Sequence, residues 1–147
     1  MESHGWKLYH YQAFENYLAK LFADVNHLKQ TKPSEFQKHP KSKFLDRILE
    51  LITNEIPLDP AHEKFQLGNT LGPSNRKWRR AKFNRFRLFF RYNSASKIII
   101  YAWINEEDQL RKAGDKNDPY RLFAKQLSKA DPPESWEELL RASQELK

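Results

Sequence analysis

The sequence KWRRAKFNRFRLFFRYNSASKIIIYAWIN, residues 77–105, contains three runs rich in aromatic and β-branched residues. Such runs favour extended backbone, so we predict strands over residues 77–83, 85–92 and 97–105. The residues between Phe83 and Phe86 predict a tight turn from the first strand to the second. The segment NSAS, residues 93–96, predicts an antiparallel hairpin that joins the second strand to the third.

Successive side chains of a strand point to opposite faces, which sorts these three strands into an apolar face and a basic face. We expect the apolar face to pack on helices; its members are Ala81, Phe83, Phe86, Leu88, Phe90, Tyr92, Ile98, Ile100, Ala102 and Ile104. The basic face combines cations with aromatic rings that we expect to be exposed. Its members are Trp78, Arg80, Lys82, Arg85, Arg87, Phe89, Arg91, Tyr101, Trp103 and Asn105.

Apolar residues at three- and four-residue steps predict helices on both sides of the strands. The helices are expected over residues 14–28, over residues 42–54, from Pro119 after the N-cap Asp118, and in PESWEELLRASQELK, whose SWEE segment at 135–138 fits a capping box. Helices and strands are segregated along the chain rather than alternating. The sequence therefore predicts an α+β fold with N-terminal helices, an antiparallel β-sheet and C-terminal helices.

Length and composition limit the class of protein. The 147 residues fit one domain, the absence of cysteine fits a cytoplasmic protein, and no apolar run is long enough to cross a membrane. The formal net charge is +7, and residues 76–91 carry eight bases and no acid, whereas the rest of the chain carries 18 bases and 19 acids. So concentrated a surplus predicts an anionic partner, most often nucleic acid.

Metal and histidine chemistry are disfavoured by spacing. The five histidines all precede the basic stretch, and none has the spacing of metal ligands. The acids of EED, residues 106–108, are consecutive and point different ways, which favours a solvated turn over a Mg²⁺ site. We therefore predict no cofactor and no metal.

The motifs GW.LY, LG, W.R.KF..RFRLFFRY, III.AWIN.E..LRK.G, Y..F.K.L and PP..WE.L follow one another from Gly5 to Leu139. In this order the pattern resembles the YhaV family of bacterial type II toxins, in the RelE-like superfamily. The resemblance implies a single RelE-like toxin domain over residues 1–147 and an endoribonuclease that cleaves mRNA and inhibits translation. It also implies a PrlF-type, AbrB-like antitoxin, binding of promoter DNA only through the complex with that antitoxin, and no membrane partner.

The resemblance also assigns candidate catalytic residues. RFRLFFRY matches a strand motif whose arginine is Arg87, and Arg80 and Lys82 match basic positions on the preceding strand. Arg111 and Tyr120 match a basic residue after the third strand and a tyrosine at the next helix start, although Tyr120 fits a core stripe equally well. The basic sheet stretch supplies the candidate RNA contacts Arg79, Arg85, Phe89, Arg91, Tyr101, Trp103 and Asn105.

These residue types suit metal-free cleavage, in which the 2′-OH of the RNA attacks the adjacent phosphate. Arg80 and Arg87 stabilise the phosphorane charge, Lys82 or Tyr120 is the base, and Arg111 favours departure of the leaving group. The alternative is a non-enzymatic RNA- or DNA-binding module that uses the same face only to grip phosphate, and an inactive relative is a third reading. Whether the ribosome positions the mRNA stays open.

Overall fold

The computed structural model describes residues 1–106, 109, 112 and 115–147. Within this part of the chain, one sheet of six strands has the order β1-β2-β5-β4-β3, with β6 paired to β2. The strands are β1 (Glu2–Ser3), β2 (Trp6–Tyr11), β3 (Arg79–Phe83), β4 (Phe86–Asn93), β5 (Ile98–Ile104) and β6 (Ser143–Glu145).

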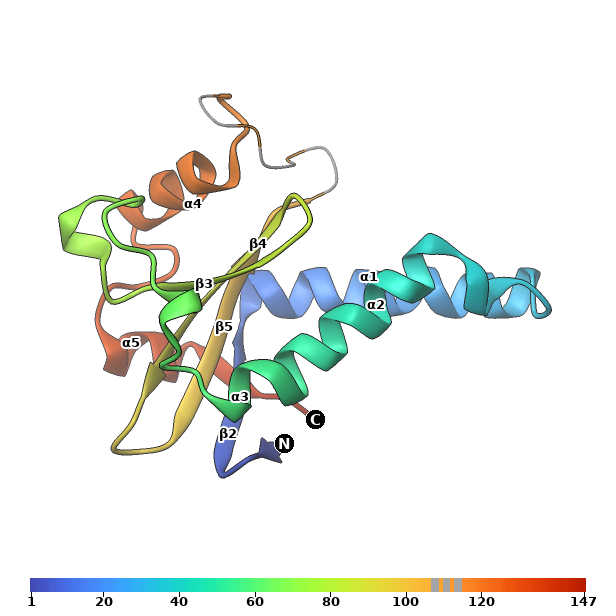
Figure 1. The fold of residues 1–147 in the computed structure, drawn as a ribbon, viewed down its shortest axis with the longest axis horizontal. Helices are drawn as coiled ribbons and strands as arrows, with labels where there is room; N and C mark the ends of the chain where they lie inside the picture. The colour runs from blue at the N-terminus through green and yellow to red at the C-terminus, as the bar shows by residue number, and fades with distance from the viewer. Residues whose placement is uncertain (107–108, 110–111, 113–114) are drawn as a thin grey trace.

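Helices cover both faces of this sheet (Figure 1). On one side lie α1 (Gln12–Thr31), α2 (Pro40–Glu50) and α3 (Ile56–Leu58), and on the other α4 (Pro119–Ser128) and α5 (Trp136–Arg141). The connections contain a π-helical turn, η2 (Leu51–Glu55), and the 3-10 turns η1 (Phe36–Lys38), η3 (Glu63–Phe65) and η4 (Pro73–Asn75). No helix in the described part of the chain has the length and apolar character needed to span a membrane.

The three predicted strands and their turns are confirmed. β3 pairs antiparallel with β4 and ends at the pair Phe83 and Phe86, so the two residues between them form the tight turn, with Asn84 in the left-handed region at φ 53°. β4 pairs antiparallel with β5 across the predicted hairpin. The prediction of a purely antiparallel sheet is wrong, because β2 pairs parallel with β5.

Three short terminal strands of the sheet were not predicted. β1 and β2 form an antiparallel pair near the N-terminus, and β2 is the parallel neighbour of β5. β6 lies in the tail that we predicted as helix, but α5 ends at Arg141 and the chain then pairs with β2. Ser135 does cap α5 as predicted, since its Oγ accepts a hydrogen bond from the Glu138 amide at 3.3 Å.

A β-bulge in β5 changes which side chains share a face. Phe90 pairs with Tyr101 and Phe89 pairs with Trp103, which leaves Ala102 as the extra residue. Before the bulge, Tyr101 therefore faces the α1 and α2 side, and Ile98, Ile100 and Ala102 face the α4 and α5 side. The predicted faces of β3 and β4 are confirmed, but those of Ile98, Ile100, Tyr101 and Ala102 are wrong, because strict alternation does not allow for an extra residue.

The first core lies between the sheet and the N-terminal helices. The predicted stripe of α1 buries Phe14, Leu18 and Leu21. The second predicted helix continues past Asn54, because η2 carries it without a break into α3. Tyr101 ties this layer to the sheet: its buried hydroxyl donates to the Ile52 carbonyl at 2.6 Å, and burial raises its pKa well above the usual value.

The second core covers the face that we expected to be exposed. Phe123 of α4 stacks on Phe89 of β4, with ring centroids 4.3 Å apart and planes 9° apart. The ring of Trp78 meets the Phe123 ring edge-on, with centroids 5.0 Å apart, and the ring of Trp103 stacks on the Phe123 ring at 5.7 Å. Aromatic side chains bury about 150–250 Å² each, so this cluster holds α4 firmly against the sheet.

Candidate active site

Three of the predicted catalytic residues meet at the start of α4. The hydroxyl oxygen of Tyr120 accepts one hydrogen bond from Nε of Arg80 at 2.8 Å and another from Nε of Arg87 at 3.1 Å. Because Arg80 pairs with Phe89 and Lys82 pairs with Arg87, the two arginines are diagonal neighbours on one face of the β3–β4 hairpin. We call these three residues the arginine–tyrosine cluster.

Backbone carbonyls hold both guanidinium groups in place. Nη1 of Arg80 donates to the carbonyls of Gln66 at 2.9 Å and Lys64 at 3.4 Å. Nη1 of Arg87 donates to the carbonyls of Phe86 at 2.8 Å and Asn84 at 3.0 Å. Among the described residues, neither arginine forms an ion pair with a carboxylate, and neither Nη2 group has a hydrogen-bond acceptor. The cluster thus presents two oriented cations with unused N–H groups.

The loop that holds Arg80 was not predicted. Residues 61–75 gave only turn signals in the sequence, but Gln66 forms an isolated antiparallel bridge with Arg79. That bridge brings the carbonyls of Lys64 and Gln66 to the guanidinium of Arg80. Because the contribution comes from backbone atoms, no residue type in the sequence signals it.

The other two predicted catalytic residues lie apart from the cluster or outside the description. Lys82 is an exposed residue on β3, directly across the hairpin from Arg87. Arg111 lies outside the described residues. No described histidine touches the cluster through a hydrogen bond; His39 and His62 instead accept bonds from the backbone amides of Lys41 and Lys64.

Asn105 does not belong to the cluster but binds the backbone of Arg87, one of its members. It is fully buried, and its Oδ1 accepts from the backbone N–H of Arg87 at 2.8 Å. Its Nδ2 donates to the carbonyls of Gln109 at 2.7 Å and Arg85 at 3.4 Å. Because the side chain is fully buried and these three bonds hold its amide inside the protein, Asn105 is not accessible to RNA, contrary to the predicted RNA contact. Asn105 is a positioning residue that joins the end of β5 to the start of β4.

The predicted aromatic contacts divide by burial. Phe89 is fully buried under Phe123, and Tyr101 is fully buried on the opposite face of the sheet. Neither ring can stack on a base, so the expectation that they are exposed is wrong. Trp103 is half-buried, and it alone of the three keeps part of its ring accessible.

The three arginines that we predicted as RNA contacts lie in different places relative to the cluster. Arg79 lies over the Tyr92 ring at 5.5 Å, on the face opposite the cluster. Arg91 lies between the rings of Trp78 and Trp136, at 5.5 and 5.6 Å, and donates to the Glu134 carbonyl at 2.7 Å. Burial lowers the pKa of Arg91. Arg85 is exposed in the β3–β4 turn, beside the cluster.

The arrangement has the chemistry to bind and polarise a phosphodiester. Two guanidinium groups on adjacent strands supply positive charge, and a phenolic oxygen lies between them. Within the described residues, no group of three or more His, Asp or Glu side chains is placed to hold a metal ion.

Comparison with known proteins assigns the class of protein. A family model described as a toxin with endonuclease activity, of a toxin–antitoxin system, matches residues 8–144. Ribonuclease toxin YhaV from Escherichia coli K12 is 38% identical over 144 residues, which are 96% of this chain and 94% of that protein. Toxin YhaV from Escherichia coli O157:H7 matches with the same identity and coverage. No solved structure matches the chain.

These matches define an endonuclease toxin of a toxin–antitoxin system. The chain belongs to the YhaV family, as the order of its motifs indicated. Such a toxin has an antitoxin partner.

The position of Asn105 generates a stability prediction. Asn105→Ala removes the acceptor of the Arg87 amide and leaves two backbone carbonyls without their donor. We expect the free energy of unfolding, measured by urea denaturation, to fall by about 1–3 kcal/mol. Asn16→Ala on the exposed surface of α1 is the control, with an expected change within about 0.5 kcal/mol. Equal stability of the two variants would contradict the positioning role.

Proposed function

We propose that this chain is a ribonuclease that cleaves mRNA, and that the arginine–tyrosine cluster is its catalytic centre. The observation that carries the proposal is the meeting of Arg80, Arg87 and Tyr120 at one hydroxyl, with no carboxylate of the described residues neutralising the arginines. The YhaV relatives support RNA as the substrate, since one of them is named a ribonuclease. Loss of mRNA accounts for inhibited translation.

Cleavage is proposed to use the RNA's own 2′-OH and no metal. The 2′-OH loses its proton, a 2′-oxygen to phosphorus bond forms, and the bond from phosphorus to the 5′-oxygen breaks. The 5′-oxygen takes up a proton, so the products are a 2′,3′-cyclic phosphate and a 5′-OH end. The protein has to stabilise the extra charge on the phosphorane and move the two protons.

The two arginines suit the first task. In this proposal the Nη2 groups of Arg80 and Arg87, which have no acceptor among the described residues, donate to the non-bridging phosphate oxygens. Their Nε and Nη1 groups are already fixed by Tyr120 and by four backbone carbonyls. Charge that is oriented before the reaction needs little reorganisation as the phosphorane forms, which is the usual source of a large electrostatic contribution.

Tyr120 is the better placed of the two candidate bases. Its oxygen lies within hydrogen-bond distance of both guanidinium groups, and therefore beside any phosphate that they bind. Lys82 is exposed and lies on β3, directly across the hairpin from Arg87, and it has no hydrogen bond to Tyr120 or to either arginine among the described residues. Arg111 is proposed to assist departure of the 5′-oxygen, and Arg85, Arg91 and Trp103 are proposed to contact the flanking RNA.

The partner proposals follow from the same face. We propose that a PrlF-type, AbrB-like antitoxin of the RelE-like toxin systems blocks the cluster with acidic and apolar side chains. Promoter DNA is bound only through that complex, and the mRNA substrate places the toxin in the cytoplasm.

The first test compares wild type with Arg87→Ala by primer extension on one mRNA, with and without translating ribosomes. We expect discrete new ends in the wild type and a loss of about 10²–10³-fold in their rate of appearance in the variant. An RNA with a 2′-deoxy residue at the cleaved position should give no end there. If neither protein yields ends but both bind RNA in a salt-sensitive way, the chain is a binding module and the catalytic assignment is wrong.

The second test separates the two candidate bases in single-turnover cleavage. Tyr120→Phe keeps the ring in its core position and removes only the hydroxyl, and we expect a rate loss of about 10²-fold or more. Lys82→Gln is the matched control, with an expected loss of less than about tenfold, because it removes only one cation from the approach to the site. The reverse order of losses would make Lys82 the base.

A further inference from the structure

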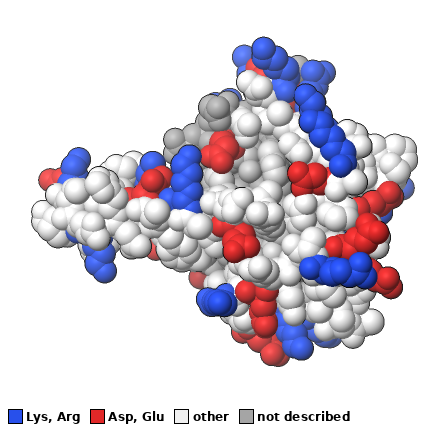
Figure 2. Space-filling model, turned by 180° about the vertical axis from the view of Figure 1, so that it is seen from behind, with Lys and Arg blue, Asp and Glu red and all other residues white. Residues whose placement is uncertain are grey.

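A second concentration of positive charge lies far from the cluster, at the end of the arm formed by α1 and α2. Residues 26–43, which we call the basic tip, contain five lysines and one acid. Outside the stretch 76–91 and the tip, the chain carries 13 bases and 18 acids, by subtraction of these from the 18 bases and 19 acids outside that stretch. The acids elsewhere therefore conceal the tip in any whole-chain count. Figure 2 shows several basic side chains along the projecting arm, with acidic side chains between them as elsewhere on this face.

The tip contains a hollow whose walls combine charged, polar and apolar side chains. The hollow, of about 400 Å³, is lined by Lys32 and Lys38, by the acid Glu35, and by Leu28, Ser34 and the half-buried Phe36 and His39. Lys29 lies over the Phe36 ring, with Nζ 5.9 Å from the centroid. Two lysines therefore line the hollow, and a third lies over one of its lining rings.

His39 adds an imidazole ring to the same hollow. Its Nδ1 accepts a hydrogen bond from the Lys41 amide at 3.1 Å, so in the neutral ring the hydrogen is on Nε2. This bond also caps the start of α2 and fixes the ring. The hollow thus brings two lysines and an imidazole together with one carboxylate, Glu35, and cations outnumber the acid there.

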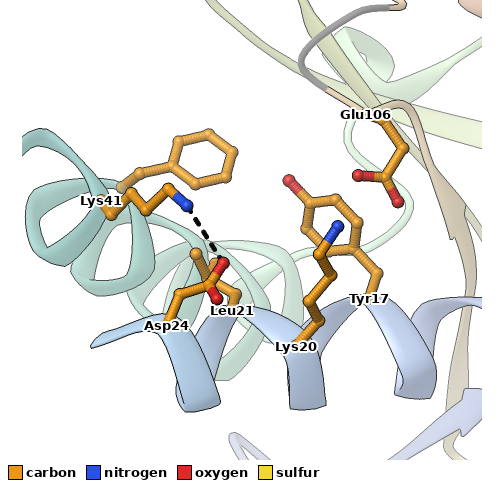
Figure 3. Close-up of a pocket in the computed structure, with 7 residues that line it drawn as sticks. Tyr17, Lys20, Leu21, Asp24, Lys41 and Glu106 are labelled. Atoms are coloured by element: carbon orange, nitrogen blue, oxygen red, sulfur yellow. Dashed lines mark hydrogen bonds and ion pairs between the residues drawn. The ribbon is translucent and has the colours of Figure 1, made fainter. Parts of the chain in front are cut away.

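Four of the five lysines of the tip are not neutralised by the described residues. Lys29, Lys32, Lys38 and Lys43 are exposed, and none forms an ion pair with a described carboxylate. The fifth, Lys41, faces a different pocket at the base of the arm (Figure 3), where it is paired with Asp24 at 3.1 Å and where Glu106 lies across from Lys20. Balanced charges make the base of the arm a poor anion site and leave the tip as the candidate.

We propose that the basic tip is a second RNA-binding surface, which holds the phosphate backbone of base-paired RNA while the cluster cleaves a single strand. The proposal rests on the proposed function, because it takes RNA as the substrate. α1 has 20 residues and runs from the sheet to the tip, a length of about 30 Å at 1.5 Å per residue. A short oligonucleotide in the cluster therefore does not reach the tip.

The side chains of the tip favour RNA over an acidic protein. The exposed large apolar residues of the described chain are Met1, Phe22 and Leu58, and none belongs to the tip. Protein interfaces depend on buried apolar or aromatic anchors and are poor in lysine. Spaced lysines without an exposed aromatic ring instead suit a regular phosphate backbone, since unpaired bases require stacking surfaces.

The test compares a tip variant, Lys29→Gln with Lys32→Gln and Lys38→Gln, with a control variant, Lys7→Gln with Lys129→Gln and Lys147→Gln. Each variant loses three charges, and all six lysines are exposed. Binding to an uncleavable 2′-O-methyl RNA duplex of about 16 base pairs is measured over a range of salt concentration. Cleavage of a five-nucleotide single strand is measured in parallel, and circular dichroism checks that each variant is folded.

We expect the tip variant to reduce the slope of log affinity against log salt by about two to three, as for the loss of three phosphate contacts, and the control variant by less than one. Both should cleave the short strand at the wild-type rate. Equal slopes for the two variants, or loss of antitoxin affinity with unchanged duplex binding, would overturn the proposal. Failure of the wild type to cleave the short strand, even with ribosomes added, would count against the proposed function and leave the slope comparison valid.

If the tip variant fails to fold, a variant with arginine at the same three positions replaces it. That variant keeps the three charges and should keep the wild-type slope; a reduced slope would contradict the charge argument.

Discussion

The stacking of Phe123 on Phe89 is the contact on which the candidate site depends. The two rings lie 4.3 Å apart and nearly parallel, and they hold α4 against the middle of β4. Tyr120 lies one turn earlier on α4, so the same contact carries its hydroxyl to Arg80 and Arg87. The apolar core and the polar cluster therefore both depend on the position of α4, and a loss of packing at Phe123 would also displace Tyr120.

The cluster places two like charges close together, and no carboxylate of the described residues forms an ion pair with either of them. Repulsion between them is offset by carbonyl oxygens from the η3 segment and the β3–β4 turn, and by the shared phenolic oxygen. Dipoles of this kind hold the cations in position without neutralising them. A carboxylate in the same place would compete with the substrate. The charge pattern thus suits a phosphoryl group that gains negative charge during the reaction.

Strands, helices and most of the candidate catalytic set were predictable, because they depend on local patterns. The runs of β-branched and aromatic residues gave β3 to β5, and the strand motif gave Arg87. Faces on β5 were not predictable, because the bulge at Ala102 leaves no signature in the alternation. Burial of Phe89 and Asn105 also escaped, since it depends on where α4 and the end of β5 come to lie. The basic tip escaped for an arithmetic reason, because acids elsewhere in the chain balance its lysines.

The most direct test of the central claim is a structure of the toxin bound to an RNA that carries a 2′-deoxy residue at the cleaved position. The account predicts that the non-bridging oxygens of the adjacent phosphate lie within hydrogen-bond distance of Nη2 of Arg80 and Arg87, with the Tyr120 oxygen beside the 2′ position. A scissile phosphate bound away from these three residues, while the strand is otherwise ordered, would contradict the assignment of the arginine–tyrosine cluster as the catalytic centre.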